Sequence, residues 1–234
     1  MTAFSWERFE AVPLVAILRG FRPAQLGPLV EAVRDGGLTT LEVTMNSPDA
    51  AGQIRAALAG GGGQLNVGAG TVTSRALLEE ALAAGASFIV TPTLQPALIA
   101  ECVRRGVPVF PGALTPTEVA AAREHGARWV KVFPADAAGP AYLRRLKDLH
   151  PDLRLMPTGG VDLETIGSYR AAGADGFGVG SPLFDRARIA AGDWAAVAAR
   201  CRAFRTALGG VRSEGVDVDL TPISPQGYAS FGSS

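Results

Sequence analysis

Lys131 lies in the middle of an apolar run, "RWVKVFPAD" at residues 128–136. The chain has 22 basic residues, of which only Lys131 and Lys147 are lysines. Arginine stays protonated at any working pH, whereas a lysine amine that is removed from water can lose its proton and act as a nucleophile. We therefore treat Lys131 as a candidate for covalent chemistry on a carbonyl group.

Eight short β-rich runs alternate along the chain with amphipathic stretches rich in Ala, Leu and Arg. The runs are residues 13–19, 39–44, 65–70, 87–92, 107–112, 128–134, 153–158 and 175–181. Regular alternation of strand and helix predicts a parallel sheet with right-handed crossovers, and eight such units close into a (β/α)8 TIM barrel. An open, doubly wound sheet is the competing architecture, but the first turn lacks a glycine-rich dinucleotide motif.

The barrel is expected to be a single domain at residues 1–208, with an N-terminal helix before residue 13 that caps the barrel floor. Residues 209–234 change abruptly to a composition rich in Gly, Ser and Pro. This composition predicts an extended C-terminal tail or arm that is partly disordered.

Glu42 is the residue most suitable as a partner for Lys131. Side chains alternate along a strand, so both charged side chains point away from the apolar residues beside them, and both face the interior if those neighbours meet the helices. The second and sixth strands of an eight-stranded ring lie opposite one another, near enough to share a small substrate. A salt bridge without catalytic function is the alternative, but buried ion pairs are costly to desolvate and are seldom kept for stability alone.

Glycine motifs close the last two predicted strands, "TGGV" at residues 158–161 and "GVGS" at residues 178–181. Barrels of this kind commonly bind phosphate through the loops after strands seven and eight, where glycines let backbone N–H groups approach closely. The expected donors are Gly159, Gly160, Gly180 and Ser181. Glycines also end strands for conformational reasons alone, so the two motifs together are more specific than either one.

Arg19 and Thr71 also follow predicted strands. An arginine at the end of "VAILRG" could bind a carboxylate through two N–H groups and lower the pKa of a nearby lysine, although a salt bridge at the barrel rim is the alternative. Thr71 follows "GAG", which is either a simple tight turn or one that leaves the threonine free to bind a carboxylate.

The composition excludes several partner classes. A formal net charge of zero, with no long basic run, does not favour binding to nucleic acid or to an anionic membrane. No apolar stretch reaches the roughly 18 to 20 residues of a membrane-spanning helix, and the N-terminus lacks the features of a secretory signal, so we expect a cytoplasmic location. Cys102, Cys201, His125 and His150 lack metal-ligand spacing, so no metal site is expected. A small-molecule partner remains.

With those residues in place, the chain resembles the class I aldolases of 2-keto-3-deoxy-6-phosphogluconate (KDPG) and of its galactonate counterpart (KDPGal), from residue 13 to about residue 205. The segments that carry the resemblance are, in order, "VAILRG", "LEVTMNSP", "GAGTV", "IVTPT", "VFPGALTPTE", "VKVFPA", "TGGV" and "GVGSPLF".

The resemblance implies a role for each matching residue. Lys131 matches the lysine that forms a Schiff base with the substrate, and Glu42 matches the acid/base glutamate. The positions at the pyruvyl carboxylate fall on Arg19, Thr71, Pro92 and Phe133, and the phosphate cradle includes Gly160, Gly180 and Ser181. The resemblance also implies a homotrimer that uses no metal and no cofactor apart from the covalent Schiff base.

The expected reaction is cleavage of a 2-keto-3-deoxy-6-phospho sugar acid to pyruvate and D-glyceraldehyde 3-phosphate. Asn46, where gluconate-type enzymes usually carry an arginine, favours the galactonate substrate, as does "GPAYLRRLK". Thr158 favours the gluconate instead, because "PTGG" is the gluconate-type pattern. We expect the galactonate, with KDPG or 4-hydroxy-2-oxoglutarate as the alternative substrate.

Two further hypotheses stay open at the level of sequence. One is a phosphate-binding barrel isomerase or synthase in which Lys131 acts as a general acid and no covalent adduct forms. The other is a sensor that binds a phosphorylated sugar acid and catalyses no reaction.

Overall fold

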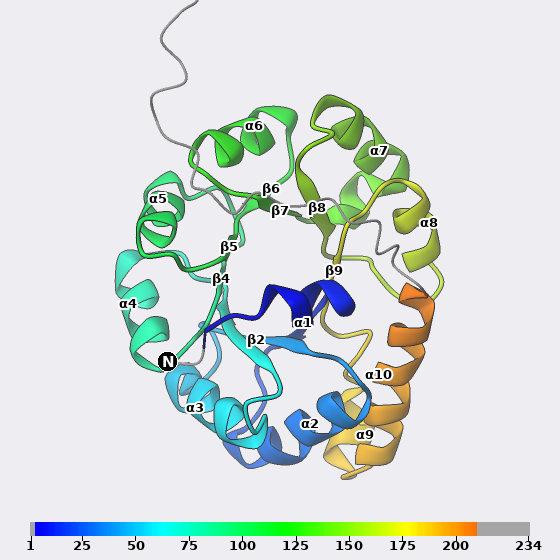
Figure 1. Cartoon of the computed structure of the whole chain (residues 1–234). Coiled ribbons are helices and arrows are strands. Elements are labelled where there is room, and N and C mark those ends of the chain that lie inside the picture. Colours follow the sequence, from blue (N-terminus) through cyan, green and yellow to red (C-terminus); the bar gives the residue numbers. More distant parts are fainter. Residues whose placement is uncertain (1–2, 210–234) are drawn as a thin grey trace, which may run out of the picture.

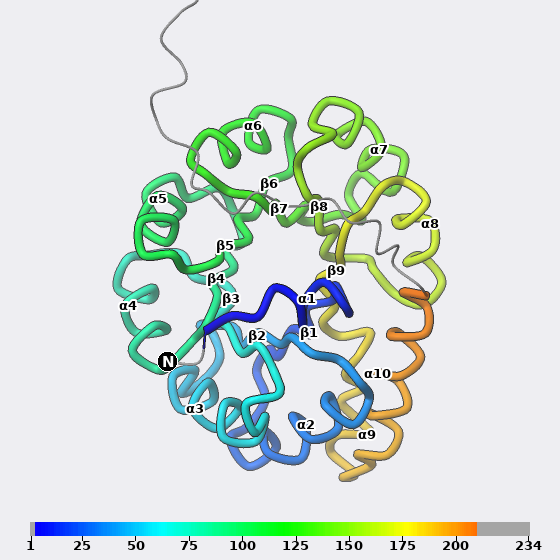
Figure 2. Tube along the Cα trace, viewed as in Figure 1, coloured from blue at the N-terminus to red at the C-terminus, as the bar shows by residue number. Residues whose placement is uncertain are grey.

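The computed structural model describes residues 3–209. Parallel strands stand around a central axis and helices surround them, as Figure 1 and the chain trace in Figure 2 show. The predicted C-terminal tail lies outside the described residues except for Gly209. The predicted α/β class is confirmed, because the paired strands of the described residues all run parallel.

The strands are β1 (Leu14–Leu18), β2 (Thr40–Thr44), β3 (Asn66–Gly70), β4 (Ile89–Val90), β5 (Val109–Phe110), β6 (Gly112–Ala113), β7 (Trp129–Val132), β8 (Arg154–Pro157) and β9 (Phe177–Val179). The helices are α1 (Trp6–Ala11), α2 (Pro23–Asp35), α3 (Ala50–Gly60), α4 (Arg75–Ala83), α5 (Pro96–Arg104), α6 (Pro116–Glu124), the 3₁₀ turn η1 (Ala135–Ala137), α7 (Gly139–Leu149), α8 (Ile166–Ala171), α9 (Arg186–Ala190) and α10 (Trp194–Leu208).

The strands form two hydrogen-bonded sheets, of order β5-β4-β3-β2-β1-β9 and β6-β7-β8. The run predicted as one strand at residues 107–112 is divided between them, because Pro111 has no N–H group to donate and separates β5 from β6. The carbonyl of Pro111 still accepts a hydrogen bond of 2.8 Å from the Lys131 backbone N–H. An isolated parallel bridge between Thr158 and Gly178 links β8 to β9.

Two apolar clusters lie on opposite sides of the strands. The larger one fills the space between strands and helices and includes Leu41, Val43, Val130 and Val132. The smaller one lies on the inner side of the strands, around the central axis, and is mostly aromatic. Its buried members are Phe9, Val15, Phe88, Val90, Phe110, Trp129 and Met156. Buried aromatic side chains of this size contribute about 1.5–3 kcal/mol each, so this inner cluster makes a stable, dry floor.

Helix α1 closes one end of the ring, as the sequence predicts (Figure 1). Phe9 is fully buried, and its ring meets the Trp129 ring edge-on at 5.0 Å between centroids. A helix of six residues is too short to be stable alone, so this packing holds it. The Asn66 side chain adds hydrogen bonds of 2.9 Å to both the N–H and the carbonyl of Ser5, the N-cap of α1.

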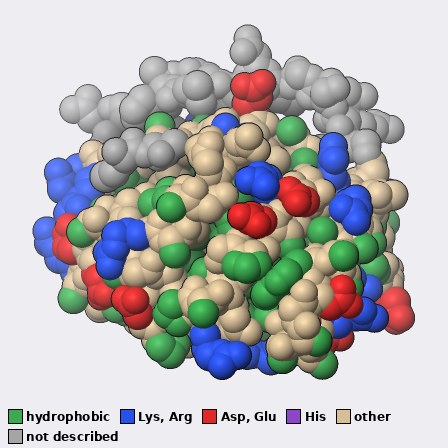
Figure 3. Space-filling view, turned by 90° about the horizontal axis from the view of Figure 1, so that it is seen from below, with side chains coloured by type: hydrophobic (Ala, Val, Ile, Leu, Met, Phe, Trp, Pro, Cys, Tyr) green, Lys and Arg blue, Asp and Glu red, His purple; other side chains and the backbone are tan. Residues whose placement is uncertain are grey.

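The cysteines, the helices and the surface charges were each considered in the sequence. Cys102 and Cys201 are free, buried thiols within α5 and α10. None of the helices formed by residues 3–209 is long and apolar enough to cross a bilayer. On the face shown in Figure 3, basic and acidic side chains lie beside one another, without one extended patch of a single sign.

Candidate active site

Lys131 in β7 and Glu42 in β2 both lie inside the ring, above the aromatic floor. Their side chains follow the predicted alternation, because the apolar residues beside each of them belong to the outer cluster and Trp129 belongs to the inner one. Lys131 is 3% exposed and Glu42 is 1% exposed. Two ionisable groups of opposite sign are therefore held away from water in the same interior.

The Glu42 carboxyl group rests on the bare backbone of Gly70. A Cβ atom on Gly70 would lie 2.5 Å from the carboxyl carbon of Glu42, which is far inside van der Waals contact. Gly70 has no left-handed φ angle, so the position requires glycine for space and not for backbone conformation. Sequence reasoning missed this residue, because both interpretations of "GAGT", a simple tight turn or one that frees Thr71, concern the turn and not the space over Gly70.

Glu42 and Lys131 do not form a structural ion pair with each other. Oε1 of Glu42 is buried without a hydrogen-bond partner, and no ion pair joins Glu42 to Lys131 in the described part of the chain. The ammonium nitrogen of Lys131 lies 4.9 Å from the centroid of the Phe133 ring. An unpaired buried carboxyl oxygen costs stability, which suggests that a ligand is its intended partner.

Burial dominates the protonation of both groups. It raises the pKa of Glu42, and the positive charges of Lys131 and Arg19 oppose that shift. It also lowers the pKa of Lys131; the Glu42 charge opposes this effect, and the Arg19 charge adds to it. Each group is thereby moved toward its uncharged form, the state in which a lysine is nucleophilic and a carboxyl group can donate a proton.

Pro92 lies beside β6, the strand that pairs with the lysine-bearing strand β7. Gly112 pairs with Lys131 in the β6–β7 ladder, and its N–H donates a hydrogen bond of 3.3 Å to Thr91 Oγ1. A Cβ on Gly112 would collide with the backbone of Thr91 and Pro92, 2.8 Å from the Thr91 carbonyl oxygen. Glycine thus lets the end of β4 approach β6, and Pro92 and Phe133 both remain half-buried there.

Arg19 and Thr71 come together at the carboxyl ends of β1 and β3. Arg19 Nη2 donates a hydrogen bond of 3.4 Å to Thr71 Oγ1. Thr71 has a φ angle of 57°, an uncommon conformation for a β-branched residue that costs of the order of 1 kcal/mol or more. Arg19 itself is exposed, so its guanidinium is available to an incoming anion.

The two glycine motifs lie on neighbouring strands. The bridge between Thr158 and Gly178 brings their loops together, and a Cβ on Gly180 would lie 3.7 Å from Ile17 Cβ. Gly159 and Gly160 have φ angles of 89° and 69°, which favour glycine. Gly180 is half-buried and Ser181 is exposed.

Asp136 of η1 is a charged neighbour that sequence reasoning did not weigh. A Cβ on Gly160 would lie 3.2 Å from the Asp136 Cα, and one on Gly159 would lie 3.5 Å from the Asp136 Oδ1. A carboxylate therefore stands beside the predicted phosphate cradle.

The two predicted specificity residues lie in different surroundings. Asn46 is exposed in the turn after β2. Thr158 is buried, and its hydroxyl donates a long hydrogen bond of 3.4 Å to the Met156 carbonyl. Its methyl group would lie 3.0 Å from a Cβ on Gly178, so the side chain fills the space that this glycine leaves.

No metal-binding cluster is found within residues 3–209, where no group of three or more His, Cys, Asp or Glu side chains could hold an ion. His125, one of the two histidines, is exposed at the end of α6, with Nδ1 2.8 Å from the Ala121 carbonyl oxygen. The expected absence of a metal stays a prediction.

Comparisons with known proteins agree with this arrangement. The profile of the family described as "KDPG and KHG aldolase" matches residues 6–200. A 2-dehydro-3-deoxy-6-phosphogalactonate aldolase of Escherichia coli (strain K12) is 35% identical, over 84% of this chain and 97% of that protein. A 2-dehydro-3-deoxy-phosphogluconate aldolase of Pseudomonas aeruginosa is 37% identical, over 75% of this chain and 80% of that protein.

Solved structures give the same result. A KDPG aldolase from Legionella pneumophila, with pyruvate captured as a covalent carbinolamine, superposes with a TM-score of 0.77 at 26% identity, covering 84% of this chain and 96% of that one. A cage-shaped protein designed by fusing symmetric oligomeric domains gives a TM-score of 0.78 at 34% identity, covering 84% and 72%. This chain belongs to the KDPG and KHG aldolase family.

Proposed function

We propose that this chain is a class I aldolase that cleaves a 2-keto-3-deoxy-6-phospho sugar acid to pyruvate and D-glyceraldehyde 3-phosphate. The observation that carries the proposal is the buried lysine and glutamate with no ion pair between them. As a member of a family of aldolases, the chain is a carbon–carbon lyase. Family membership also argues against the isomerase and sensor hypotheses.

Uncharged Lys131 attacks the C2 carbonyl of the substrate and forms a carbinolamine, which loses water to give an iminium ion. The iminium withdraws electrons from C3. The covalent carbinolamine captured in the Legionella aldolase supports this first step.

Glu42 then accepts the proton of the C4 hydroxyl group, directly or through a water molecule, and the C3–C4 bond breaks. The electron pair of that bond moves into the iminium and gives an enamine, while glyceraldehyde 3-phosphate leaves. Glu42 returns its proton to C3 of the enamine, and hydrolysis of the new iminium releases pyruvate and frees Lys131. The pKa of Glu42, which burial raises, suits a group that must both accept and return a proton.

The remaining site residues would hold the substrate at its two ends. Arg19, Thr71, Pro92 and Phe133 would bind the pyruvyl end. Gly159, Gly160, Gly180 and Ser181 would bind the phosphate through backbone N–H groups and one hydroxyl group. Fixing both ends aligns C2 with the lysine nitrogen and reduces the entropic cost of the reaction. The proposed chemistry uses no metal and no cofactor.

We propose the galactonate epimer as the substrate, with KDPG or 4-hydroxy-2-oxoglutarate as the alternative. The exposed Asn46 supports the galactonate and the buried Thr158 supports the gluconate. Epimers at C4 differ in one hydroxyl direction, and an unpaired buried polar group costs about 1–3 kcal/mol, enough for a clear preference.

The proposal also covers the barrel architecture, the oligomeric state and the cellular location. We infer that the two sheets belong to one (β/α)8 barrel, which the Thr158–Gly178 bridge and the continuous chain through Pro111 support. A homotrimer is proposed, and the designed cage of symmetric oligomeric domains supports self-association. The cytoplasmic location remains a prediction from the sequence.

Pyruvate release from the two phosphorylated epimers, measured side by side, tests the proposal. The expected result is release from both, with the higher kcat/KM for the galactonate. A higher value for the gluconate would reverse the epimer assignment alone. No pyruvate from either epimer, or from 4-hydroxy-2-oxoglutarate, would overturn the function.

A further inference from the structure

Three contacts join the start of α9 and the residues just before it to the loop that carries Arg19. Arg186 Nη2 donates a hydrogen bond of 3.0 Å to the backbone carbonyl of Arg19, across 167 positions of sequence. The same guanidinium stacks on the Phe21 ring, 5.3 Å from its centroid. The Phe21 ring also meets the Phe184 ring edge-on, at 5.8 Å between centroids. We refer to Phe21, Phe184 and Arg186 as the loop clamp.

The loop at residues 19–22 connects β1 to α2. Few atoms pack against it near Arg19 and Gly20. Gly20 has a φ angle of 67°, and within residues 3–209 the one atom that lies within 4 Å of a Cβ placed there is Arg186 Nη2, at 3.7 Å. The Arg19 side chain is exposed, and in the described part of the chain its guanidinium makes one hydrogen bond, the 3.4 Å contact to Thr71. A long, exposed side chain can be placed accurately only if its backbone is fixed.

Other hydrogen bonds also hold the loop. Arg22 N–H donates to Gln25 Oε1 of α2 at 3.0 Å, and the bonds at Gly20 and Phe21 come from the side of β2 and α3. The Gly20 N–H donates to Ser47 Oγ at 2.9 Å, and Gln53 Nε2 donates to the Phe21 carbonyl at 2.9 Å. Arg186 supplies the tie from the opposite side, where β9 pairs with β1. Loss of Arg186 therefore removes the hydrogen bond to the Arg19 carbonyl from this side, and leaves the Phe21–Phe184 ring contact as the tie to the segment after β9.

We propose that Arg186 is a positioning residue, which fixes residues 19–22 so that the Arg19 guanidinium meets the carboxylate of the keto acid. This inference rests on the proposed function, in which Arg19 binds that carboxylate. Arginine suits the task because its planar group donates a hydrogen bond while its face lies on an aromatic ring. A lysine offers a point charge and cannot match both contacts.

The clamp also connects the two ends of the proposed substrate site. Ala16 pairs with Val179 across β1 and β9, so the loop after β9, with Gly180 and Ser181, lies beside the loop after β1. Arg186 follows that phosphate-binding loop and holds the carboxylate-binding one. The spacing between the two substrate ends is thus set by a contact outside the reacting centre.

Exchange of the methyl hydrogens of pyruvate with deuterated water isolates this role, because pyruvate carries the carboxylate and no phosphate. Arg186→Gln should raise the KM for pyruvate about tenfold with little change in kcat, the size expected for losing one hydrogen bond to a charged group. Arg188→Gln is the matched control, since Arg188 lies on the same helix and pairs with Asp193 at 2.7 Å. It should leave both constants unchanged. Arg186→Lys should restore little of the loss.

An unchanged KM for pyruvate in Arg186→Gln would overturn the inference. An increase in KM confined to the phosphorylated substrate would also overturn it, because Arg186 would then bind the phosphate directly. Phe21→Leu removes the stacking surface, keeps an apolar side chain, and should raise the KM for pyruvate in the same direction if Arg186→Gln fails to fold. Borohydride trapping of pyruvate on the unaltered protein keeps the tests separate: no adduct means that the proposed function has failed, whereas an adduct with an unaffected Arg186 variant means that only this inference has.

Discussion

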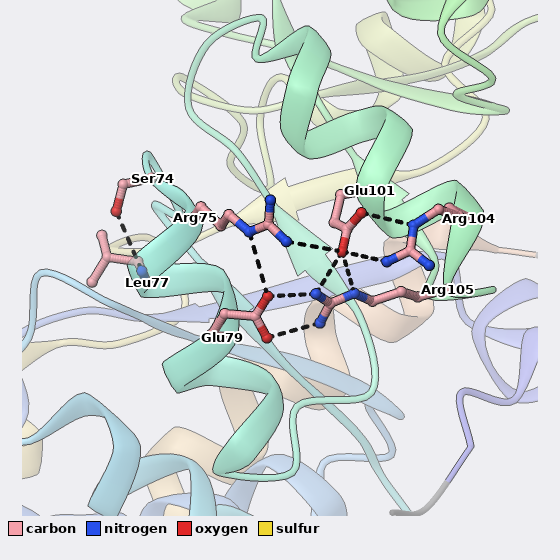
Figure 4. A network of polar contacts seen from close by, with 7 residues as sticks. All are labelled: Ser74, Arg75, Leu77, Glu79, Glu101, Arg104 and Arg105. Carbon is pink, nitrogen blue, oxygen red and sulfur yellow. Dashed lines mark hydrogen bonds and ion pairs between the residues drawn. The ribbon is translucent and has the colours of Figure 1, made fainter.

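Charged side chains are unpaired in one region of this protein and closely paired in another. In the interior, Lys131 and Glu42 lie within one apolar ring without a hydrogen bond or ion pair to each other. On the outside, two glutamates and three arginines on α4, on α5 and at the C-cap of α5 form a connected cluster, which Figure 4 shows. We call it the surface cluster; it consists of Arg75, Glu79, Glu101, Arg104 and Arg105.

Every acid of the surface cluster has close basic partners. Glu101 receives hydrogen bonds of 2.7 Å and 2.9 Å from Arg104 and one of 2.6 Å from Arg105. These bonds lower the pKa of Glu101 to about 2. Arg105 also bonds Glu79 through both of its terminal nitrogens and so ties α5 to α4.

The difference shows which charges are arranged for stability and which are left for a ligand. Hydrogen bonds stabilise the ionised forms in the surface cluster, whereas burial opposes ionisation of the interior pair. A charge that is buried without a partner is costly to keep, so its retention indicates function. The following variants test this contrast.

Lys131→Arg should have the largest effect. The guanidinium stays protonated and cannot form an iminium, so turnover should fall by at least about 1,000-fold while the protein remains folded. Pyruvate release and circular dichroism measure the two outcomes. Lys147→Arg serves as the control, because Lys147 bonds Asp175 at 2.8 Å and is outside the proposed site. Retained cleavage in Lys131→Arg would remove the Schiff-base role.

Glu42→Gln should separate the covalent step from the proton transfers. Loss of a general acid/base group lowers kcat by about 100- to 10,000-fold. Borohydride trapping of pyruvate should still label Lys131, because the amine is unchanged. An unlabelled Lys131 in this variant would mean that Glu42 is needed for imine formation itself.

Gly70→Ala should impair catalysis through a residue that takes no part in the chemistry. The new methyl group displaces the Glu42 carboxyl, and a shift of about 1 Å at a reacting group can cost about 100-fold in rate. Deuterium exchange into pyruvate measures the loss, and the acid limb of its pH profile should shift with the displaced carboxyl.

Gly68→Ala is the control on the same strand. A Cβ there would lie 2.6 Å from Phe88 Cγ in the aromatic floor, below the Glu42 carboxyl. Overpacking of this kind costs about 1–3 kcal/mol of stability and should leave the pH profile of exchange in place. Equal pH profiles for the two alanine variants would contradict a specific role for Gly70.

The stability of Glu42→Gln should depend on pH in a defined direction. Because burial raises the pKa of Glu42 above its usual 4.5, the native state holds this proton more tightly than the unfolded chain does. That stabilisation is complete below pH 4.5 and is lost as the pH rises through the native pKa. Urea unfolding should therefore show Glu42→Gln gaining stability over the unaltered protein across this window. A difference independent of pH would show that Glu42 is not desolvated.

Arg105→Gln should have the smallest effect on function. It opens the surface cluster and lowers the melting temperature, more at low salt than at high salt, because exposed ion pairs are screened. Turnover should not change. Arg75→Gln is the graded comparison, since its contacts to Glu79 and Glu101 are both 3.8 Å, and should affect the melting temperature less. A fall in turnover with Arg105→Gln would contradict the assignment of the surface cluster to stability alone.

The sequence predicted much of this arrangement because strand patterns carry local information. A lysine flanked by valines and a glutamate flanked by leucine and valine could each be assigned a direction from the period of two alone. The space over Gly70 could not be predicted, since it depends on the register between β2 and β3. The contact of Arg186 with Arg19 joins opposite ends of the chain, and no local pattern encodes it.

Mass spectrometry of the protein after treatment with pyruvate and borohydride tests the central claim most directly. The account predicts irreversible inactivation and one reduced pyruvyl group on the peptide that contains Lys131, with no adduct in Lys131→Arg. An unmodified Lys131 peptide from protein that still releases pyruvate would contradict it.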